Sequence, residues 1–255
     1  MEKNIILAGV GGQGILSIAF VIDNAAVDAG YHFKQAEVHG MAQRGGAVQS
    51  NLRYGDSEIH SDIIPTGRAD LILSIEPLEV LRYWHFLQPD GWVVTSITPY
   101  VNIPDYPETD DLLAQLAAFD NIVMVDTAHI AKAAGNLRAQ NMAAIGAASD
   151  LLDFSDEQLL RFVEKLFARK GEKIVAVNQR AFKYGRAAGL FFSGLVDGGM
   201  PRLAAIKLSA KLAADTIDPE YAGAWSEAIG DDDSRLEAVL AEKEAVACDQ
   251  AASFA

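Results

Sequence analysis

A ten-residue segment near the N-terminus gathers side chains that can bind or move charge. Its sequence is Glu37-Val38-His39-Gly40-Met41-Ala42-Gln43-Arg44-Gly45-Gly46. The small residues allow a ligand or a second backbone to approach closely. Arginine is a planar, permanently charged donor that suits a carboxylate or a phosphate. We therefore expect a loop that binds a ligand, with Arg44 meeting a carboxylate or a phosphate.

The same loop also permits plainer interpretations. Arg44 can pair with Glu37 and brace the loop instead of binding a ligand. His39 can titrate near neutral pH, but a lone histidine beside an acid is commonly a hydrogen-bonded structural residue. No serine, cysteine or lysine forms a recognisable nucleophile–base pair with His39. The sequence therefore indicates no complete active site and no certain catalytic residue.

A glycine-rich turn precedes this loop. It follows the apolar run at residues 5–8 and opens a segment with helical spacing at residues 15–29. Such glycines permit a tight turn, and the N-terminus of the following helix favours an anion. We expect it to bind a phosphate or another anion, although the glycines can also serve only close helix packing. The predicted cofactor-binding residues of the turn are Gly9, Gly11, Gly12, Gln13 and Gly14.

Strands and helices alternate through the first half of the chain. Further buried strands are expected at residues 31–38, 71–75, 92–97 and 122–126, with helices at 77–87 and 110–119. The alternation of strands and helices is then interrupted in two places. A β-hairpin is expected from residues 47–54 and 57–64, and helices at 128–134, 141–152, 155–168 and 178–188, the third capped by Ser155. The predicted fold is α/β, with a Rossmann-like open, mostly parallel sheet, an inserted β-hairpin and a helical C-terminal part.

The last part of the chain differs in composition. We expect a catalytic domain over residues 1–198 and a helical, acidic C-terminal extension over residues 199–255. The extension begins with a predicted helix at residues 202–216 and a break at Asp218-Pro219. Acids outnumber bases from Asp231 onward, which is typical of a solvated helix and tail.

The composition excludes several classes of protein. The formal net charge is −14, so binding a nucleic acid over a broad surface is disfavoured. Cys248 is the only cysteine, so the chain supplies neither four thiolates for an iron–sulfur cluster nor a cysteine-rich zinc site. The five histidines lack paired metal-ligand spacing. No apolar run reaches the ~20 residues that span a bilayer, and the N-terminus lacks the pattern of a signal peptide. We expect a cytoplasmic protein with no metal, nucleic-acid or membrane site.

Three motifs together resemble a known family. They are Gly9-Val10-Gly11-Gly12-Gln13-Gly14, the Glu37–Gly46 loop, and Asn141-Met142 followed by Ile145-Gly146-Ala147. The chain is similar over residues 1–195 to the gamma-type subunits of 2-oxoacid:ferredoxin oxidoreductases, and within that family to the indolepyruvate ferredoxin oxidoreductase beta subunits. The resemblance implies that Gln43 and Arg44 contribute to a shared site. It also implies that the loop residues Glu37, His39, Gly45 and Gly46 bind a cofactor together with Asn141.

The resemblance implies an enzyme divided among chains. The expected reaction is oxidative decarboxylation of indolepyruvate or another aryl pyruvate to an acyl-CoA, with electrons passed to ferredoxin. Thiamine diphosphate with Mg²⁺ and [4Fe–4S] clusters are expected on a large alpha-type partner, with coenzyme A bound in the complex and no cofactor held tightly by this chain. The isolated chain is then expected to be inactive.

Two other functions stay open at this point. The glycine turn and Glu37 also fit a free-standing NAD(P)-binding Rossmann oxidoreductase, although a hairpin stands where such domains have a helix and no hydride-transfer residue is evident. The loop can instead be the docking surface of a non-catalytic binding module.

Overall fold

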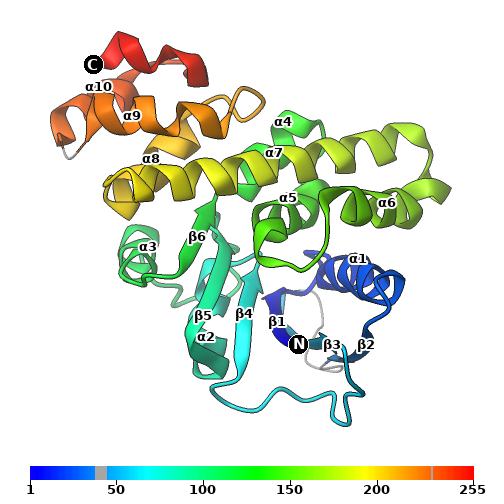
Figure 1. The fold of residues 1–255 in the computed structure, drawn as a ribbon. Helices are drawn as coiled ribbons and strands as arrows, with labels where there is room; N and C mark the ends of the chain where they lie inside the picture. The colour runs from blue at the N-terminus through cyan, green and yellow to red at the C-terminus, as the bar shows by residue number, and fades with distance from the viewer. Residues whose placement is uncertain (38–44, 231) are drawn as a thin grey trace.

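A six-stranded sheet forms the centre of the computed structural model, which describes residues 1–37, 45–230 and 232–255 (Figure 1). Its strand order is β2-β3-β1-β4-β5-β6. Strands β1, β4, β5 and β6 pair in parallel, whereas β3 is antiparallel to both of its neighbours. The mostly parallel sheet expected from the sequence is therefore confirmed. The strands are β1 (Glu2–Val10), β2 (His32–Glu37), β3 (Ala47–Gly55), β4 (Ala69–Ser74), β5 (Leu87–Ser96) and β6 (Ile122–Val125).

The predicted pairing of residues 47–54 with residues 57–64 is not observed. Strand β3 pairs with β2, from His32 opposite Gly55 to Glu37 opposite Ser50, and on its other side with β1. Both edges of β3 are therefore occupied, so residues 57–64 have no strand to join and form none. The Arg53 guanidinium instead donates hydrogen bonds to the carbonyl oxygens of Ser61 and Ile63 and holds this segment in an irregular path.

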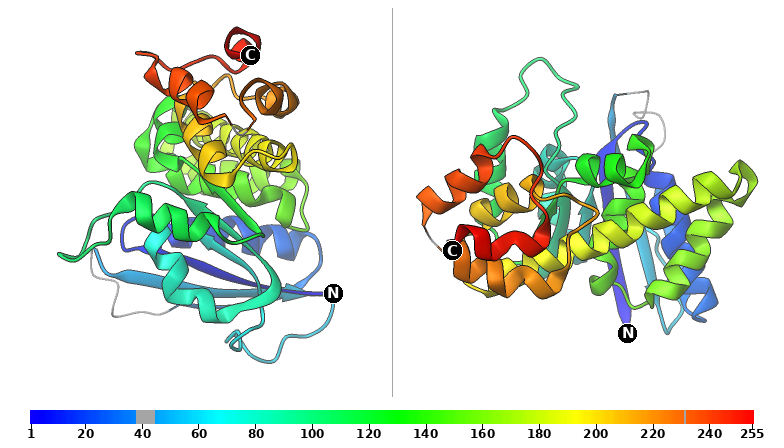
Figure 2. Two further views of the ribbon diagram at one scale, coloured as in Figure 1. Left: turned by 90° about the vertical axis from the view of Figure 1, so that its left-hand side faces the viewer. Right: turned by 90° about the horizontal axis from the view of Figure 1, so that it is seen from above.

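Helices cover both faces of the sheet. On one face, α1 (Ile15–Asp28) packs over β1, β2 and β3, and α5 (Gln140–Ala148) packs over β4, β5 and β6. Helix α2 (Pro77–Tyr83) contacts β1, β4 and β5 from the opposite face (Figure 2). The remaining helices of this part are α3 (Thr109–Ala117), α4 (Thr127–Ala134), α6 (Asp156–Phe167) and α7 (Glu172–Asp197).

Helices α5 and α7 touch backbone to backbone. A Cβ atom on Gly146 would lie 2.0 Å from the Phe182 carbonyl oxygen, and one on Gly185 would lie 2.0 Å from the Ala143 carbonyl oxygen. Only glycine permits this approach. The close contact seats α5 between the sheet and α7, so the first turn of α5 reaches the glycine turn after β1.

Most predicted helices form, with shifted ends. Ser155 caps α6 in a capping box with Gln158, as its sequence position predicts. Helix α7 is much longer than the predicted 178–188, and the predicted helix at 141–152 ends at Ala148 and continues as a single 3₁₀ turn. Strand β5 begins at Leu87, five residues before the predicted start.

The C-terminal segment is better packed than its acidity indicates. It contains α8 (Arg202–Lys211), α9 (Ala222–Ile229), α10 (Asp233–Ala241) and a 3₁₀ segment (Cys248–Phe254). Trp225 is fully buried, and its Nε1 donates a hydrogen bond of 2.7 Å to the Cys248 carbonyl oxygen. Most of residues 232–255 are exposed, whereas Leu236, Val239, Val246, Cys248 and Ala251 are buried and form a small core.

Among the described residues, none of the helices combines the length and the apolar character needed to span a bilayer.

Candidate functional site

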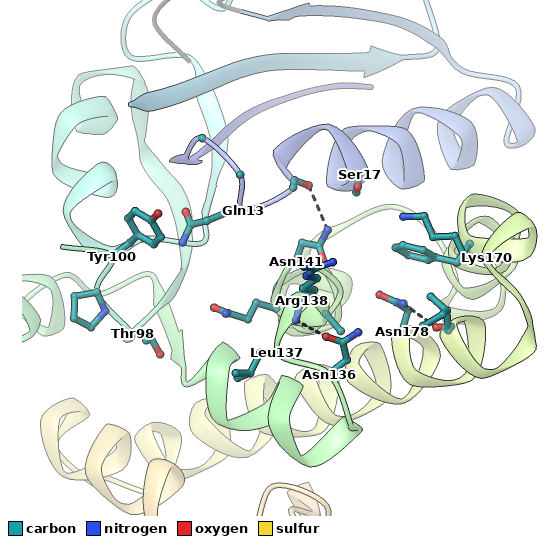
Figure 3. Close-up of a pocket in the computed structure, with 18 residues that line it drawn as sticks. Gln13, Ser17, Thr98, Tyr100, Asn136, Leu137, Arg138, Asn141, Lys170 and Asn178 are labelled. Carbon is teal, nitrogen blue, oxygen red and sulfur yellow. Dashed lines mark hydrogen bonds between the residues drawn. The ribbon is translucent and has the colours of Figure 1, made fainter. Parts of the chain in front are cut away.

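A cleft of about 640 Å³ opens at the carboxyl ends of the parallel strands. Open α/β sheets bind ligands at this edge. Figure 3 shows Gln13, Thr98 and Tyr100 at one end of the cleft, Lys170 and Asn178 at the other, and Arg138 and Asn141 between them. The lining residues are Gly11, Gly12, Gln13, Gly14, Ser17, Thr98, Pro99, Tyr100, Asn136, Leu137, Arg138, Ala139, Gln140, Asn141, Phe167, Lys170, Ile174 and Asn178.

The predicted glycine turn forms one wall of the cleft. Gly12 and Gly14 have φ values of +106° and +86°, which other residues rarely adopt. The Gln13 side chain braces the turn, because its Oε1 accepts from the Val10 N–H at 2.7 Å and its Nε2 donates to the Ile75 carbonyl oxygen at 3.4 Å. No side chain caps the start of α1. The turn therefore presents mainly backbone and the positive end of α1 to the cleft.

Asn141 meets this turn from a distant part of the chain. It is 4% exposed, and its Nδ2 donates to the Gly14 carbonyl oxygen at 3.4 Å. Its Oδ1 accepts from the Met142 N–H at 3.0 Å. A Cβ atom on Gly14 would lie only 2.6 Å from Asn141 Nδ2. The structure thus brings these two predicted residues into contact, and both line the cleft.

The end of the predicted binding loop lies against the same turn. The Gly11 N–H donates to the Gly46 carbonyl oxygen at 2.8 Å, and the Gly45 N–H donates to the Gly11 carbonyl oxygen at 3.4 Å. Asn102 Nδ2 donates to the Gly45 carbonyl oxygen at 2.7 Å. Gly45 and Gly46 are therefore anchored beside the cleft without lining it.

The other predicted residues fall elsewhere. His39, Gln43 and Arg44 lie outside the described residues. Glu37 ends β2 and is separated from β1 by β3, and it does not line the cleft. A Cβ atom on Gly9 would approach Gln13 Oε1 and Ile15 Cδ1 to 2.9 Å, so Gly9 makes room for the turn.

Two cations of the cleft were not identified from the sequence. Arg138 follows the break after α4, and Lys170 lies at the junction of α6 and α7. Both are exposed, and within the described parts of the chain neither forms an ion pair. Of the residues that the structure describes, no carboxylate lines the cleft. In a chain with a net charge of −14, this lining favours an anionic ligand. Arg138 and Lys170 are far from the glycine turn in the sequence. No local motif therefore predicts that they line the same cleft.

A buried carboxylate stands behind the Thr98–Tyr100 wall. Glu76 is 1% exposed and caps α2 through the Glu79 N–H at 2.9 Å. It also accepts hydrogen bonds from the Tyr100 N–H at 3.2 Å and from the Tyr106 hydroxyl. Burial, and then the hydrogen bond to Glu76, raise the pKa of Tyr106 well above its ordinary value. Tyr106 therefore stays a neutral donor at physiological pH.

Of the cofactors implied by the family resemblance, those that need metal or thiolate ligands do not fit the described residues, whereas phosphate groups fit the cleft. Within residues 1–37, 45–230 and 232–255, no three histidine, cysteine, aspartate or glutamate side chains are placed to hold a metal ion. Cys248 is buried in the C-terminal segment, and burial raises the pKa of its thiol. Thiamine diphosphate binds through a divalent metal that prefers oxygen ligands such as carboxylates, and the cleft offers none. Phosphate groups without a metal fit the cleft better.

Three cationic side chains of α7 have structural partners or lie outside the cleft. Arg180 donates to the Ala134 carbonyl oxygen at 2.9 Å, and Arg186 pairs with Asp156 at 2.7 Å. Lys183 is exposed on α7 and does not line the cleft. Trp84 stacks on Phe119 with ring centroids 3.8 Å apart, which is a packing role.

Known proteins resemble this chain in sequence and in fold. The indolepyruvate oxidoreductase subunit IorB of Thermococcus kodakarensis is 36% identical over 204 residues, which cover 76% of this chain and 99% of the relative. A pyruvate oxidoreductase subunit PORC of Thermotoga maritima shares the fold, with a TM-score of 0.55, 20% identity and coverage of 72% of this chain and 95% of that one.

A longer protein shares the fold as well. The 2-oxoglutarate:ferredoxin oxidoreductase of Magnetococcus marinus, whose structure holds 2-oxoglutarate, coenzyme A and succinyl-CoA, matches with a TM-score of 0.58 and 20% identity. The match covers 78% of this chain and 37% of that one. The family model described as pyruvate ferredoxin/flavodoxin oxidoreductase matches residues 4–188. The resemblance seen in the glycine turn, the binding loop and the Asn141 segment is thereby confirmed, and the chain belongs to the pyruvate ferredoxin/flavodoxin oxidoreductase family.

Proposed function

We propose that this chain is the small, gamma-type subunit of a cytoplasmic 2-oxoacid:ferredoxin oxidoreductase that uses indolepyruvate or another aryl pyruvate. The complex converts the 2-oxoacid, coenzyme A and two oxidised ferredoxins to acyl-CoA, CO₂, a proton and two reduced ferredoxins. The extent and identity of the IorB match support the choice of 2-oxoacid. The iron–sulfur clusters belong to the larger partner, since this chain has one cysteine. The thiamine diphosphate belongs there too, since no carboxylate among the described residues of the cleft could hold its metal ion.

The cleft is the observation that carries the proposal for this chain's own role. It combines the N-terminus of α1, the cations Arg138 and Lys170, and no carboxylate. Coenzyme A brings a diphosphate and a 3′-phosphate to the reaction, and each is an acceptor for backbone N–H groups and cationic side chains. We assign the cleft to these phosphates, with Asn141 and Asn178 as polar supports.

In this role the chain binds and orients the acyl acceptor. Thiamine diphosphate, when bound to the partner, supplies the decarboxylation chemistry. The present residues hold phosphate groups by charge and by backbone N–H donors, and thereby deliver the thiol end of coenzyme A toward the partner. Fixing two reactants in one geometry lowers the entropic cost of their reaction.

The mouth of the cleft carries the surface that would face the larger subunit. Tyr100 and Leu137 line the cleft and are 44% and 55% exposed. Leu16 and Val101, each next in sequence to a lining residue, are 58% and 69% exposed. Contiguous exposed apolar groups commonly mark protein interfaces. A partner covering them would also exclude water from the cleft.

The geometry disfavours a free-standing NAD(P) enzyme. Such a domain needs an acid beside the adenosine ribose, next to the glycine turn. Glu37 ends β2, and β3 separates that strand from β1.

Reconstitution tests the proposed function. This chain is co-expressed with a large subunit that carries thiamine and cluster motifs, and reduction of methyl viologen is followed with indolepyruvate and coenzyme A. We expect turnover only when both chains and both substrates are present. Turnover by this chain alone, or an unchanged rate when it is omitted, would contradict the proposal. Micromolar NADH binding that weakens in Glu37→Ala would favour the dinucleotide enzyme instead.

A further inference from the structure

The segment between β5 and α3 forms one wall of the cleft although it has no regular structure of its own. This segment, residues 97–108, is called the strap below. It contributes Thr98, Pro99 and Tyr100 to the lining, and Figure 3 shows Thr98 and Tyr100 at the end of the cleft nearest Gln13. An ordered segment of this length without helix or strand needs fixed anchors, because its backbone is otherwise free to move.

Glu76 provides the central anchor from the end of β4. Its Oε1 accepts from the Tyr100 N–H at 3.2 Å and from the Tyr106 hydroxyl, so one oxygen holds two points of the strap. Its Oε2 accepts from the Glu79 N–H at 2.9 Å. One carboxylate oxygen of Glu76 therefore binds the strap, and the other caps the start of α2.

The backbone around Glu76 is itself fixed to the glycine turn. The Ile75 N–H donates to the Ala8 carbonyl oxygen at 3.1 Å, and the Ile75 carbonyl oxygen accepts from Gln13 Nε2 at 3.4 Å. The Ser74 hydroxyl donates to the Glu76 carbonyl oxygen at 2.6 Å. The backbone that carries Glu76 is thus hydrogen-bonded to β1 and to the glycine turn, which forms the opposite wall of the cleft.

The strap reaches the predicted binding loop through a second contact. Asn102 Nδ2 donates to the Gly45 carbonyl oxygen at 2.7 Å, and Gly45 in turn pairs with Gly11 of the glycine turn. The strap is therefore held by Glu76 on one side and supports the end of the binding loop on the other.

We propose that Glu76 is a positioning residue for the cleft: its buried carboxylate fixes the strap, and the strap sets the Thr98–Tyr100 wall and the Gly45 end of the binding loop. Glu76 does not line the cleft, so it acts through Tyr100, Asn102 and Tyr106. The expected consequence for binding rests on the proposed function, whereas the anchoring of the strap does not.

Hydrogen–deuterium exchange of the full chain tests the anchoring without any ligand. Tyr106→Phe removes one donor to Glu76 and leaves the cap of α2 intact. We expect exchange of residues 98–106 to accelerate at least threefold. Glu76→Leu removes both contacts to the strap and should accelerate it further, whereas Glu76→Gln keeps an acceptor at Oε1 and should preserve most of the protection.

A matched control separates positioning from helix capping. Asp218 caps a short 3₁₀ helix in the C-terminal segment through the Glu220 N–H at 3.0 Å and is remote from the strap in its contacts. Asp218→Ala, which removes this cap, should leave exchange of residues 98–106 unchanged. Equal exchange in the unaltered chain, Tyr106→Phe and Glu76→Leu would overturn the proposal and reduce Glu76 to a helix cap.

Steady-state kinetics of the reconstituted complex test the consequence for binding. In Tyr106→Phe and Asn102→Ala we expect the KM for coenzyme A to rise about fivefold, with kcat and the KM for the 2-oxoacid within twofold of their original values. A purely structural role would lower kcat in proportion to the amount of folded complex and leave both KM values unchanged, and that result would overturn the proposal. Failure of the unaltered complex to use coenzyme A would instead contradict the proposed function, while the exchange result still decides the role of Glu76.

Discussion

Among the described residues, Arg138 and Lys170 are the two charged side chains that line the cleft, and neither forms an ion pair. Lys170 lies over the Phe167 ring, with Nζ 5.2 Å from its centroid. This contact leaves the ammonium free to meet an anion. Exposed cations that form no internal ion pair are expected to act on a ligand, and their effect should weaken as salt screens it.

Removing these charges should weaken the binding of coenzyme A. A hydrogen bond to a charged group contributes about 1.5–3 kcal/mol, and exposure reduces this, so we expect Arg138→Ala or Lys170→Ala to raise the KM for coenzyme A about five- to tenfold. The KM for the 2-oxoacid should change less than twofold. Lys183→Ala, which removes an exposed lysine outside the cleft, is the control. Equal effects of all three substitutions would show that only the overall charge matters.

Asp23 shows how a single buried group affects stability. It lies on α1 and is 8% exposed, and its Oδ1 is buried without a hydrogen-bond partner. Burial raises the pKa of this carboxyl from 3.8 to about 7. The folded state therefore favours the protonated form. The stability it confers is full below about pH 4 and is lost as the pH rises through about 7.

Asp23→Asn should remove this pH dependence. A pKa difference of about three units corresponds to about 4 kcal/mol at most. We therefore expect the free energy of unfolding of the variant, relative to the unaltered chain, to increase by up to that amount between pH 4 and pH 8. Chemical denaturation across this range measures it, with Asp249→Asn as an exposed control. A difference that stays constant with pH would mean that Asp23 ionises freely in the folded state.

At the residue level, the sequence predicted the parts of the site that local spacing defines. Gly11, Gly12, Gln13 and Gly14 line the cleft because a strand, a glycine turn and a helix follow one another at the edge of the sheet. Asn141, which was named from the family resemblance and not from local spacing, lines it too. That these residues bind a cofactor stays a prediction. Arg138, Lys170 and Asn178 reach the cleft only because α5 and α7 pack together. No short-range pattern marks such residues, and their selection depends on tertiary structure.

The pairing of the strands could not be predicted from short-range sequence patterns either. Alternation in residues 47–54 predicted a strand correctly, and the strand is there. Its partners were not predictable from alternation, which specifies the faces of a strand and not its neighbours. The insertion of β3 between β2 and β1 depends on tertiary packing, and it separates Glu37 from the glycine turn.

Helix packing gives a sharper test at this level. Gly185→Ala would place a Cβ atom 2.0 Å from the Ala143 carbonyl oxygen, so α5 and α7 would have to separate. Overpacking of this kind costs about 3 kcal/mol or more. At about 2–4 °C for each kcal/mol, the melting temperature should fall by about 6–12 °C.

Gly223→Ala in α9 is the matched control. A Cβ atom there would contact nothing within 4 Å, so the higher helix propensity of alanine should stabilise the chain by about 1 kcal/mol. Thermal unfolding of both variants decides the matter. Equal melting temperatures would show that α5 and α7 can adjust their separation freely.

The whole chain is longer than the match to its family. That match ends at residue 188, and the IorB relative is covered almost completely by 76% of this chain. The C-terminal segment packs against the family fold, since His129 Nε2 lies 3.1 Å from the Leu212 carbonyl oxygen and Arg202 donates to the Asp120 carbonyl oxygen at 2.9 Å. The boundary at residue 198 stays a prediction, and these contacts indicate that the segment is a packed addition.

Assembly with the larger subunit should depend on the apolar mouth of the cleft. Val101 and Leu137 are exposed large apolar side chains at this mouth, from the strap and from the connection between α4 and α5. Burying a charge without a partner in an interface is strongly unfavourable, so Val101→Asp combined with Leu137→Asp should weaken association at least tenfold. Ile63→Asp introduces the same charge at a residue that is 55% exposed between β3 and β4 and serves as the control. Size-exclusion chromatography and titration of the tagged large subunit measure the effect. If the double variant assembles like Ile63→Asp, the partner covers another face, and the cleft must then exclude water by means of this chain alone.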